Sequence, residues 1–443
     1  MAAAVRQLDV AVATAVAAEP NLGARLKNLV RKGLLAVTDQ ALFSGANFLV
    51  NILLARWLTA AEYGAYSLAF AVFLLLAALH GAILIEPMMV FGAGKYYSRF
   101  PRYLRVLIGG HFRLMLPSSL LLLGGAFFLA RRYSIEASDA FLGLLIGAAA
   151  ILLFWLVRRA FYVLLQPAYG VLSGALYFVL LIGGVIALKL TNRLTIVTAF
   201  IAMGAAGLVA SAIMLTRFVP AWRTAAHDPT LKDVTGDHWR YGRWALATAL
   251  IGWFPGHIYY ALLPAWLGLE GAGGLRALMN FVMPVLQAIS ALTMLLLPTL
   301  VRDRAQGGTR KMNRTMLLFL ALFCGGAVVY LAGLWIFRGS VFQIFYGGKY
   351  GEYAGWPLFL TALLPLGTCA SAVLGDGLRA LERPDSIFWC YAGSMLGCVA
   401  VGIPLSAAIG ISGALLGLIA SSAISVALMV WLYRKSLRQE GKA

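Results

Sequence analysis

The sequence predicts an all-α polytopic membrane protein with about twelve transmembrane helices in two six-helix lobes that form a central cavity. Three observations predict it. Of the 443 residues, 61% are apolar and only 12% are charged, whereas soluble proteins carry about 25% charged residues. Apolar blocks long enough to cross a bilayer recur along the chain, and its two halves share a sequence repeat. This composition excludes a soluble enzyme, a DNA-binding domain and a disordered protein.

The apolar blocks begin at Leu34 and are about 18–25 residues long, which suits a hydrocarbon core of about 30 Å. Lipid cannot satisfy backbone polar groups, and these runs are continuously apolar rather than alternating, so we expect helices and not barrel strands. The predicted spans are 34–55, 65–87, 114–130, 140–157, 168–189, 195–217, 244–267, 277–300, 315–337, 354–376, 386–409 and 412–433.

Residues 1–33 form a basic segment before the first span, and we expect no signal peptide because Glu19-Pro20-Asn21 stands where a cleavage site would be. Within this segment, 22–35 places leucines on one helical face and basic residues on the rest. This pattern is typical either of an interfacial helix on anionic headgroups or of a basic flank to the first span.

The basic residues indicate the orientation. With the N-terminus inside, 28 of the 36 Lys and Arg residues fall on the inner side of the predicted spans. This bias predicts cytoplasmic N- and C-termini and supports an even number of helices. A polar interruption at 220–243 then forms a cytoplasmic linker between a first lobe at 34–219 and a second lobe at 244–433, and 434–443 is a basic cytoplasmic tail.

The two halves carry matching short motifs. Trp57-Leu58 followed by Gly64 recurs as Trp266-Leu267 followed by Gly273. Arg113-x-Met-Leu and a later Gly-Gly-Ala recur from Arg314 with the same internal spacing. Six helices per half would insert both halves in the same direction, so we expect an axis along the membrane normal, with a substrate path between the lobes and alternating access by rocking.

Polar residues form a stripe on the first span. Gln40, Ser44, Asn47 and Asn51 follow the spacing i, i+4, i+7, i+11, and Asp39 lies beside them. Such a face is costly in lipid and should point into protein or a wet cavity. We interpret it as a substrate path, with hydrogen bonding between helices as the alternative, especially for the amides.

A similar line follows the eighth span, where Arg276, Asn280 and Gln287 lie on one face with Met283. Arg276 and Arg56 are both placed near outer helix ends. Each is therefore either a substrate-path residue or an arginine that extends to the lipid headgroups.

Four further residues are candidates for coupling or gating. Glu86 closes the second span, and His80 and His257 lie nearer mid-membrane, where a histidine can exchange protons near neutral pH. The alternatives are an anchoring carboxylate and neutral, hydrogen-bonding histidines. Pro255, directly before Gly256 and His257, is expected to bend the seventh span.

We expect neither enzyme chemistry nor a cofactor or metal. The chain has no H-E-x-x-H or P-loop motif. The cysteines Cys324, Cys369, Cys390 and Cys398 all lie in apolar stretches without metal-ligand spacing. Energy would have to come from an ion gradient, the membrane potential or consumption of the substrate.

Three stretches resemble a known family: DQALFSGANFLVNILLARWLTAAEYGAYSLAFAVFLLL from Asp39, IEPMMVFG from Ile85 and LGLEGAGGLRALMNFVMPV from Leu267. They resemble the polysaccharide-transporter flippases, the O-antigen and exopolysaccharide repeat-unit exporters of the multidrug/oligosaccharidyl-lipid/polysaccharide superfamily. The resemblance covers residues 30–110 and 265–300 best, and elsewhere it is mainly topological.

The resemblance implies two six-helix lobes around a V-shaped cavity that flips undecaprenyl-diphosphate-linked oligosaccharides across the bacterial inner membrane. Expected partners are that lipid-linked substrate, membrane lipids and polysaccharide polymerase or assembly proteins, with no nucleic acid. A diphosphate favours a cationic cavity, yet the predicted spans place their basic residues at helix ends. No functional residue of the family is carried over.

Two other functions stay open. One is an ion-coupled multidrug or organic-cation antiporter of the same superfamily, in which Asp39 and Glu86 would bind the ion. The other is a polytopic polysaccharide polymerase or ligase. That class needs a large outer loop, and the longest outer interruption here is about 338–353.

Overall fold

The computed structural model describes residues 22–223, 231–381 and 383–440, and the regular elements in these ranges are all helical. The first half contains α2 (Leu22–Trp57), α3 (Ala60–His80), the π-helical turn η1 (Gly81–Ile85), α4 (Glu86–Ala93), η2 (Tyr97–Arg99), α5 (Phe100–Arg132), α6 (Ile135–Val163), α7 (Pro167–Leu190), α8 (Ile196–Leu215) and α9 (Val219–Arg223). The second half contains α10 (Leu231–His257), α11 (Tyr259–Leu267), α12 (Leu269–Ile336), α13 (Arg338–Tyr346), η3 (Gly351–Ala354), α14 (Trp356–Ala380), α15 (Pro384–Gly397), η4 (Cys398–Gly402) and α16 (Ile403–Glu440).

The described chain runs through the bundle twelve times, as predicted. Eleven segments are long and apolar enough to cross a membrane, and the last of them, Ser386–Gln439, is broken at Ile409–Gly410. The element α12, which contains two of the eleven segments, turns back in the same way at Gly307–Gly308. Gly308 has φ +66° and Gly410 has φ +60°, a backbone region that glycine enters at little cost. The protein is therefore a multi-pass membrane protein.

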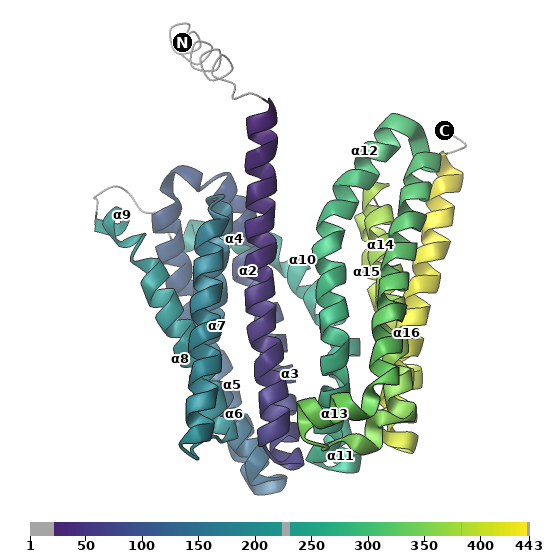
Figure 1. Ribbon diagram of the computed structural model, residues 1–443. Coiled ribbons are helices and arrows are strands. Elements are labelled where there is room, and N and C mark those ends of the chain that lie inside the picture. The colour runs from purple at the N-terminus through teal and green to yellow at the C-terminus, as the bar shows by residue number, and fades with distance from the viewer. Residues whose placement is uncertain (1–21, 224–230, 382, 441–443) are drawn as a thin grey trace, which may run out of the picture.

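The helices form two lobes. Figure 1 shows α2–α8 on one side and α12, α14 and α16 on the other, splayed at the end where α2 begins and α16 ends. The lobes converge at the opposite end, where α11 and α13 lie. The helix α10 packs against α3, η1 and α4 of the first lobe and also against α15 of the second.

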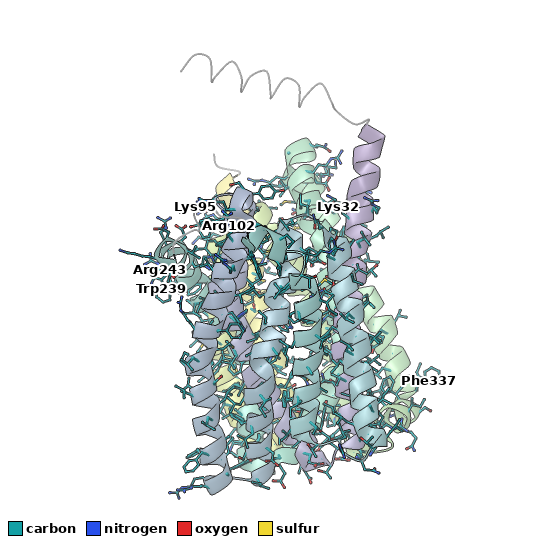
Figure 2. The ribbon with its side chains drawn as sticks, turned by 90° about the vertical axis from the view of Figure 1, so that its left-hand side faces the viewer. Lys32, Lys95, Arg102, Trp239, Arg243 and Phe337 are labelled. Carbon is teal, nitrogen blue, oxygen red and sulfur yellow. The ribbon has the colours of Figure 1, made fainter. Side chains whose placement is uncertain are left out.

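Figure 2 shows Lys32, Lys95 and Arg102 at the splayed end and Phe337 at the converging end. Lys95 and Arg102 were both predicted on the basic inner side.

The sequence repeat has a structural counterpart. Met115 on α5 and Met316 on the returning arm of α12 are 5% and 6% exposed, while the next residues, Leu116 and Leu317, are 65% and 66% exposed. Ala126 and Ala327, at the end of the same motif, are both buried. Matched positions therefore present matched faces to the lobe interior and to the lipid, which supports a duplicated half.

Several helices extend beyond the predicted spans. The helix α2 begins at Leu22 and runs unbroken into the first crossing, so the basic stretch there is a helical flank and not a separate interfacial helix. The predicted linker 220–243 is helical from Leu231 onward. Backbone hydrogen bonding continues past the lipid boundary, while hydropathy marks only the part that crosses it.

Candidate functional site

A pocket of about 390 Å³ lies between the two lobes. Its walls come from α2, α3, α6 and α12. It is lined by Gln40, Ala41, Phe43, Ser44, Gly45, Asn47, Phe48, Asn51, Phe70, Leu74, Trp155, Arg276, Asn280, Met283, Pro284 and Gln287. The pocket thus combines apolar and aromatic walls with a row of amides and one guanidinium, a composition typical of small-molecule and headgroup sites.

The two polar stripes face each other across this pocket. Gln40 Nε2 on α2 donates to Gln287 Oε1 on α12 over 3.4 Å, and about three turns along α2, Arg276 Nε donates to Asn51 Oδ1 over 3.1 Å. Seven of the nine residues predicted for a substrate path line the pocket: Gln40, Ser44, Asn47, Asn51, Arg276, Asn280 and Gln287. The equal spacing of the stripes explains why two helices from different halves meet along one line.

Arg276 is the charged group of the pocket. It lies about two turns inside α12, because that helix begins at Leu269, and its side chain is buried. The guanidinium carbon sits 4.5 Å from the centre of the Phe70 ring and 5.9 Å from that of Tyr260, so cation–π contacts add to the bond with Asn51. The alternative that Arg276 extends to the headgroups is therefore wrong.

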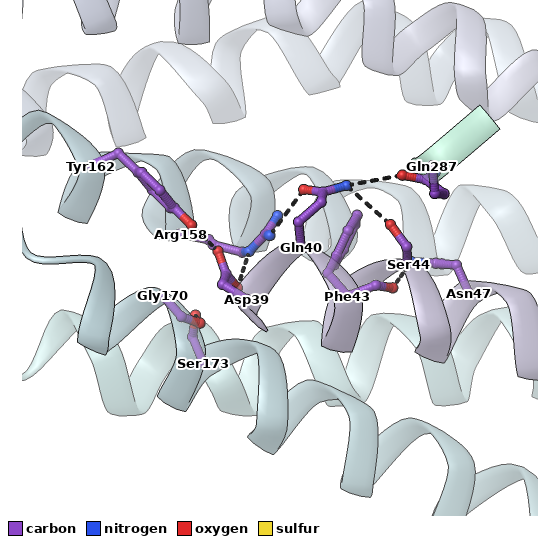
Figure 3. Close-up of polar contacts among 10 residues, drawn as sticks. All are labelled: Asp39, Gln40, Phe43, Ser44, Asn47, Arg158, Tyr162, Gly170, Ser173 and Gln287. Carbon is purple, nitrogen blue, oxygen red and sulfur yellow. Dashed lines mark hydrogen bonds and ion pairs between the residues drawn. The ribbon is translucent and has the colours of Figure 1, made fainter. Parts of the chain in front are cut away.

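Asp39 does not line the pocket. Its side chain is fully buried and points into the first lobe, where Arg158 Nε of α6 donates to Oδ1 over 2.8 Å and the Tyr162 hydroxyl donates to Oδ2. Figure 3 shows this cluster with Gly170 of α7 beside it. A Cβ on Gly174 would come within 2.8 Å of Asp39 Oδ1, so α7 accommodates the carboxylate only because it carries glycine there.

The ion pair reaches the pocket through Gln40. Arg158 Nη2 donates to Gln40 Oε1 over 3.4 Å, and Gln40 Nε2 donates to Ser44 Oγ over 3.0 Å. The Arg158 guanidinium also lies 4.4 Å from the centre of the Phe43 ring. Arg158, paired with Asp39, therefore orients the side-chain amide of Gln40 in the pocket, and the two charges of the pair neutralise each other behind it.

The sequence prediction missed Arg158, which it placed outside the span 140–157 as a basic inner residue. In the structure α6 continues to Val163, and Arg158 lies on its buried face. The segment Gln166-Pro167, where α7 begins, marks the helix end better than the first charge does. Tyr162, one turn beyond Arg158, has the right spacing to share its face.

Arg56 lies outside the pocket, with an exposed side chain. Its Nη1 donates to the Ile344 carbonyl of α13 over 2.5 Å, and Lys349 Nζ donates to the Leu58 carbonyl over 2.7 Å. Nearer the pocket, Asn280 Nδ2 donates to the Tyr63 hydroxyl over 3.0 Å. These bonds join the two lobes at the converging end and close the pocket there.

The four coupling or gating candidates also lie outside the pocket's lining. His80 is buried at the end of α3, directly before η1, and its Nε2 lies 3.0 Å from Nδ1 of His111 on α5. Glu86 is exposed at the start of α4. His257 Nδ1 lies 3.0 Å from the Trp253 carbonyl. Pro255 remains within α10, and the helix is interrupted a few residues later, between α10 and α11.

No known protein family matches the sequence, and no curated protein matches it. Solved structures do match. An inward-facing multidrug resistance MATE family transporter of the MOP superfamily aligns with TM-score 0.77 at 14% identity, over 91% of this chain and 96% of that one. An outward-facing conformation of such a transporter aligns with TM-score 0.63 at 13% identity, over 93% and 96%.

A second kind of transporter is also similar in fold. The lipid II flippase MurJ, in an inward closed conformation, aligns with TM-score 0.73 at 14% identity, over 91% of this chain and 87% of that one. At these identities the comparison concerns the fold. The chain has the transporter fold that MATE proteins and MurJ share.

Proposed function

We propose that this protein is a flippase that moves undecaprenyl-diphosphate-linked oligosaccharide repeat units across the bacterial inner membrane, for O-antigen or exopolysaccharide synthesis. The observation that carries the proposal is the charge of the inter-lobe pocket. Arg276 lines it, and no Asp or Glu stands among the described residues that do. Such a pocket attracts an anionic headgroup and disfavours a cation.

The contacts of Arg276 leave its charge available. Within the described chain Arg276 donates a hydrogen bond to the amide oxygen of Asn51 and makes cation–π contacts with the rings of Phe70 and Tyr260. All three partners are neutral groups. A guanidinium can therefore form charge-assisted bonds with phosphate oxygens. The neighbouring amides and Ser44 offer donors and acceptors to sugar hydroxyls.

The arrangement of the lobes supports alternating access. They are splayed at the end with the basic residues and joined at the other end through α3, α12 and α13. A substrate made on the cytoplasmic side would enter between them, and rocking about the joined end would release it opposite. In this proposal the basic ends of α2 and α16 lie in the cytoplasm, and polysaccharide polymerase or assembly proteins are further partners.

The second candidate is an ion-coupled antiporter for multidrug or organic-cation substrates, which the fold similarity to MATE transporters favours. That function needs an acid in or beside the cavity. Asp39 is buried in an ion pair with Arg158, and Glu86 is exposed on α4 away from the pocket. The charge distribution therefore favours the flippase.

Deletion of the gene tests the choice. In the deletion strain, lipid-linked repeat units should accumulate on the inner leaflet while surface polysaccharide disappears. Re-expression of the wild-type chain should restore both, and Arg276→Ala at equal protein level should not. Unchanged surface glycan together with new sensitivity to cationic dyes would reject the flippase and establish the antiporter.

A further inference from the structure

A second cavity lies on the outside of the first lobe. It has a volume of about 380 Å³ and is formed by η1, α5 and α10. Its lining consists of Ile83, Leu84, Leu107, Gly110, Arg113, Val234, Thr235, His238 and Trp239. We call it the α5–α10 groove. It shares no residue with the inter-lobe pocket.

The groove is apolar inside and has a tryptophan at its edge. Leu84, Leu107 and Val234 form a buried floor, and Trp239 is 56% exposed. Figure 2 shows Trp239 and Arg243 on the flank of the bundle opposite α2, slightly below the basic end marked by Lys95. Tryptophan is enriched at this depth, where hydrocarbon meets headgroups. The groove thus faces the region in which a phospholipid's phosphate and upper acyl chain lie.

Polar contacts of His238 fix α10 against the other two elements of the groove, η1 and α5. His238 Nδ1 lies 2.8 Å from the Ile83 carbonyl of the π-helical turn, and its Nε2 lies 2.5 Å from the Tyr103 hydroxyl of α5. A neutral imidazole satisfies both, because Nδ1–H donates to the carbonyl and Nε2 accepts from the hydroxyl. A Cβ on Gly242 would come within 2.9 Å of the Ala82 carbonyl, so α10 is pressed directly against the turn.

The mouth of the groove is positively charged. Arg113 lines it with an exposed side chain. No Asp or Glu is among the described residues that line the groove. Asp237, the acid adjacent to His238, is engaged by Lys95 Nζ over 2.6 Å, by the Tyr96 hydroxyl over 2.7 Å and by Arg240 Nη2 over 3.6 Å.

We propose that the α5–α10 groove binds an anionic phospholipid of the surrounding bilayer, with an acyl chain against Leu84, Leu107 and Val234 and the phosphate group at Arg113. The apolar floor and the membrane depth select a lipid. The arginine at the mouth and the lack of lining acids select a negative headgroup. Bound there, the lipid contacts both the π-helical turn of the first lobe and α10, the helix that packs against both lobes.

The repeat supplies a matched control. Arg314 occupies the position of Arg113 in the second half, is also exposed, and lies outside the groove. For a steric test, a Cβ on Gly110 would make only ordinary contact, 3.7 Å from Leu84 Cδ2. Gly110→Phe should therefore fill the groove while α5 stays in place.

The test is native mass spectrometry of the delipidated full-length protein titrated with phosphatidylglycerol or phosphatidylcholine. Wild type should bind phosphatidylglycerol more tightly than phosphatidylcholine. Arg113→Gln should weaken phosphatidylglycerol binding about fivefold. It should weaken phosphatidylcholine binding less, because the choline group offsets the charge of the phosphate that Arg113 contacts. Gly110→Phe should reduce binding of both lipids, and Arg314→Gln should behave as wild type.

Equal affinity of wild type for the two lipids would overturn the proposal, and so would equal losses in Arg113→Gln and Arg314→Gln. If Arg113→Gln does not fold, bromine-labelled phosphatidylglycerol replaces it as the probe. The bromolipid should quench the fluorescence of Trp239, so this part of the quenching should be absent in Trp239→Phe. If Trp239→Phe is quenched as strongly as wild type, the lipid binds elsewhere. None of these outcomes depends on which substrate the inter-lobe pocket carries.

Discussion

Gly64 and Gly273 occupy the same position in the two halves of the sequence, and they lie against each other where the lobes converge. A Cβ on Gly273 would stand 3.2 Å from the Gly64 nitrogen, and a Cβ on Gly64 would stand 1.8 Å from the Leu269 carbonyl oxygen. The repeat therefore brings α3 and α12 to backbone contact between the two lobes. Under the proposed alternating access, this contact would be the pivot about which the lobes rock.

Gly64→Ala should separate α3 from α12, because no rotamer of a methyl group avoids the Leu269 carbonyl. Overpacking of this kind costs about 1–3 kcal/mol, and we expect a lower melting temperature for the purified protein together with reduced transport. Gly333→Ala on α12 is the control, since a Cβ there meets nothing within 4 Å. Equal melting temperatures for the two variants would contradict the contact.

The pair formed by Asp39 and Arg158 should show strong coupling. Asp39→Asn leaves a buried guanidinium without its counter-charge, which costs roughly 3–5 kcal/mol of unfolding free energy. Arg158→Leu should cost a similar amount, and the double variant should cost much less than the sum. A double-mutant cycle from thermal or denaturant unfolding measures the coupling, and additive losses would show that the pair contributes nothing.

Arg276→Ala should reduce transport of the lipid-linked oligosaccharide about ten- to a hundredfold at unchanged protein level, the range for losing a hydrogen bond to a charged group. Arg276→Lys should retain part of the activity, because the charge remains while the planar fork is lost. Arg132→Ala, which removes an exposed arginine at the end of α5, should transport normally. Full activity of Arg276→Ala would show that the pocket is not part of the transport pathway.

Docking of α10 on the first lobe should weaken in mild acid. Burial lowers the pKa of His238 from its ordinary value of 6.5. When α10 separates from the first lobe, His238 regains its ordinary pKa and binds a proton below about pH 6.5, whereas in the docked state it stays neutral. The free energy of docking is therefore at its full value above about pH 6.5 and decreases as the pH falls below it. The hydrogen bond from Lys95 lowers the pKa of Asp237 from 3.8, so that contribution is lost only in stronger acid.

Hydrogen–deuterium exchange of residues 231–243 measures this effect. After correction for the intrinsic rate, protection should be lower at about pH 5 than at about pH 7.5. In His238→Gln the difference between these two conditions should vanish. A wild-type segment equally protected at both would mean that His238 does not hold α10.

Hydropathy and the repeat were sufficient to predict the twelve crossings and the two lobes, because lipid imposes a length and a composition on each span. The stripe on α2 and the line on α12 were also predictable, since a polar face in lipid must turn inward. These two patterns contain seven of the residues that line the inter-lobe pocket.

The partner of Asp39 was beyond such reasoning. Arg158 lies 119 positions away, and its charge made it resemble the end of a span when it is buried within one. Likewise, the sequence placed Arg276 near a helix end because Glu270 and the glycines around it interrupt the apolar run. Capping and turn residues determine where a helix ends, whereas hydropathy shows only where the chain leaves the lipid. A charged residue buried inside a lobe makes these two positions differ.

The isolated charge of Arg276 has an electrical consequence. The guanidinium is attached to α12 and does not cross the membrane, so an anionic headgroup released on the far side carries its own charge across. Each unit of charge moved through the bilayer gains about 2.3 kcal/mol per 100 mV when the cytoplasm is negative. Export of an anion through this pocket would therefore be driven by the membrane voltage, whereas extrusion of an organic cation would work against it.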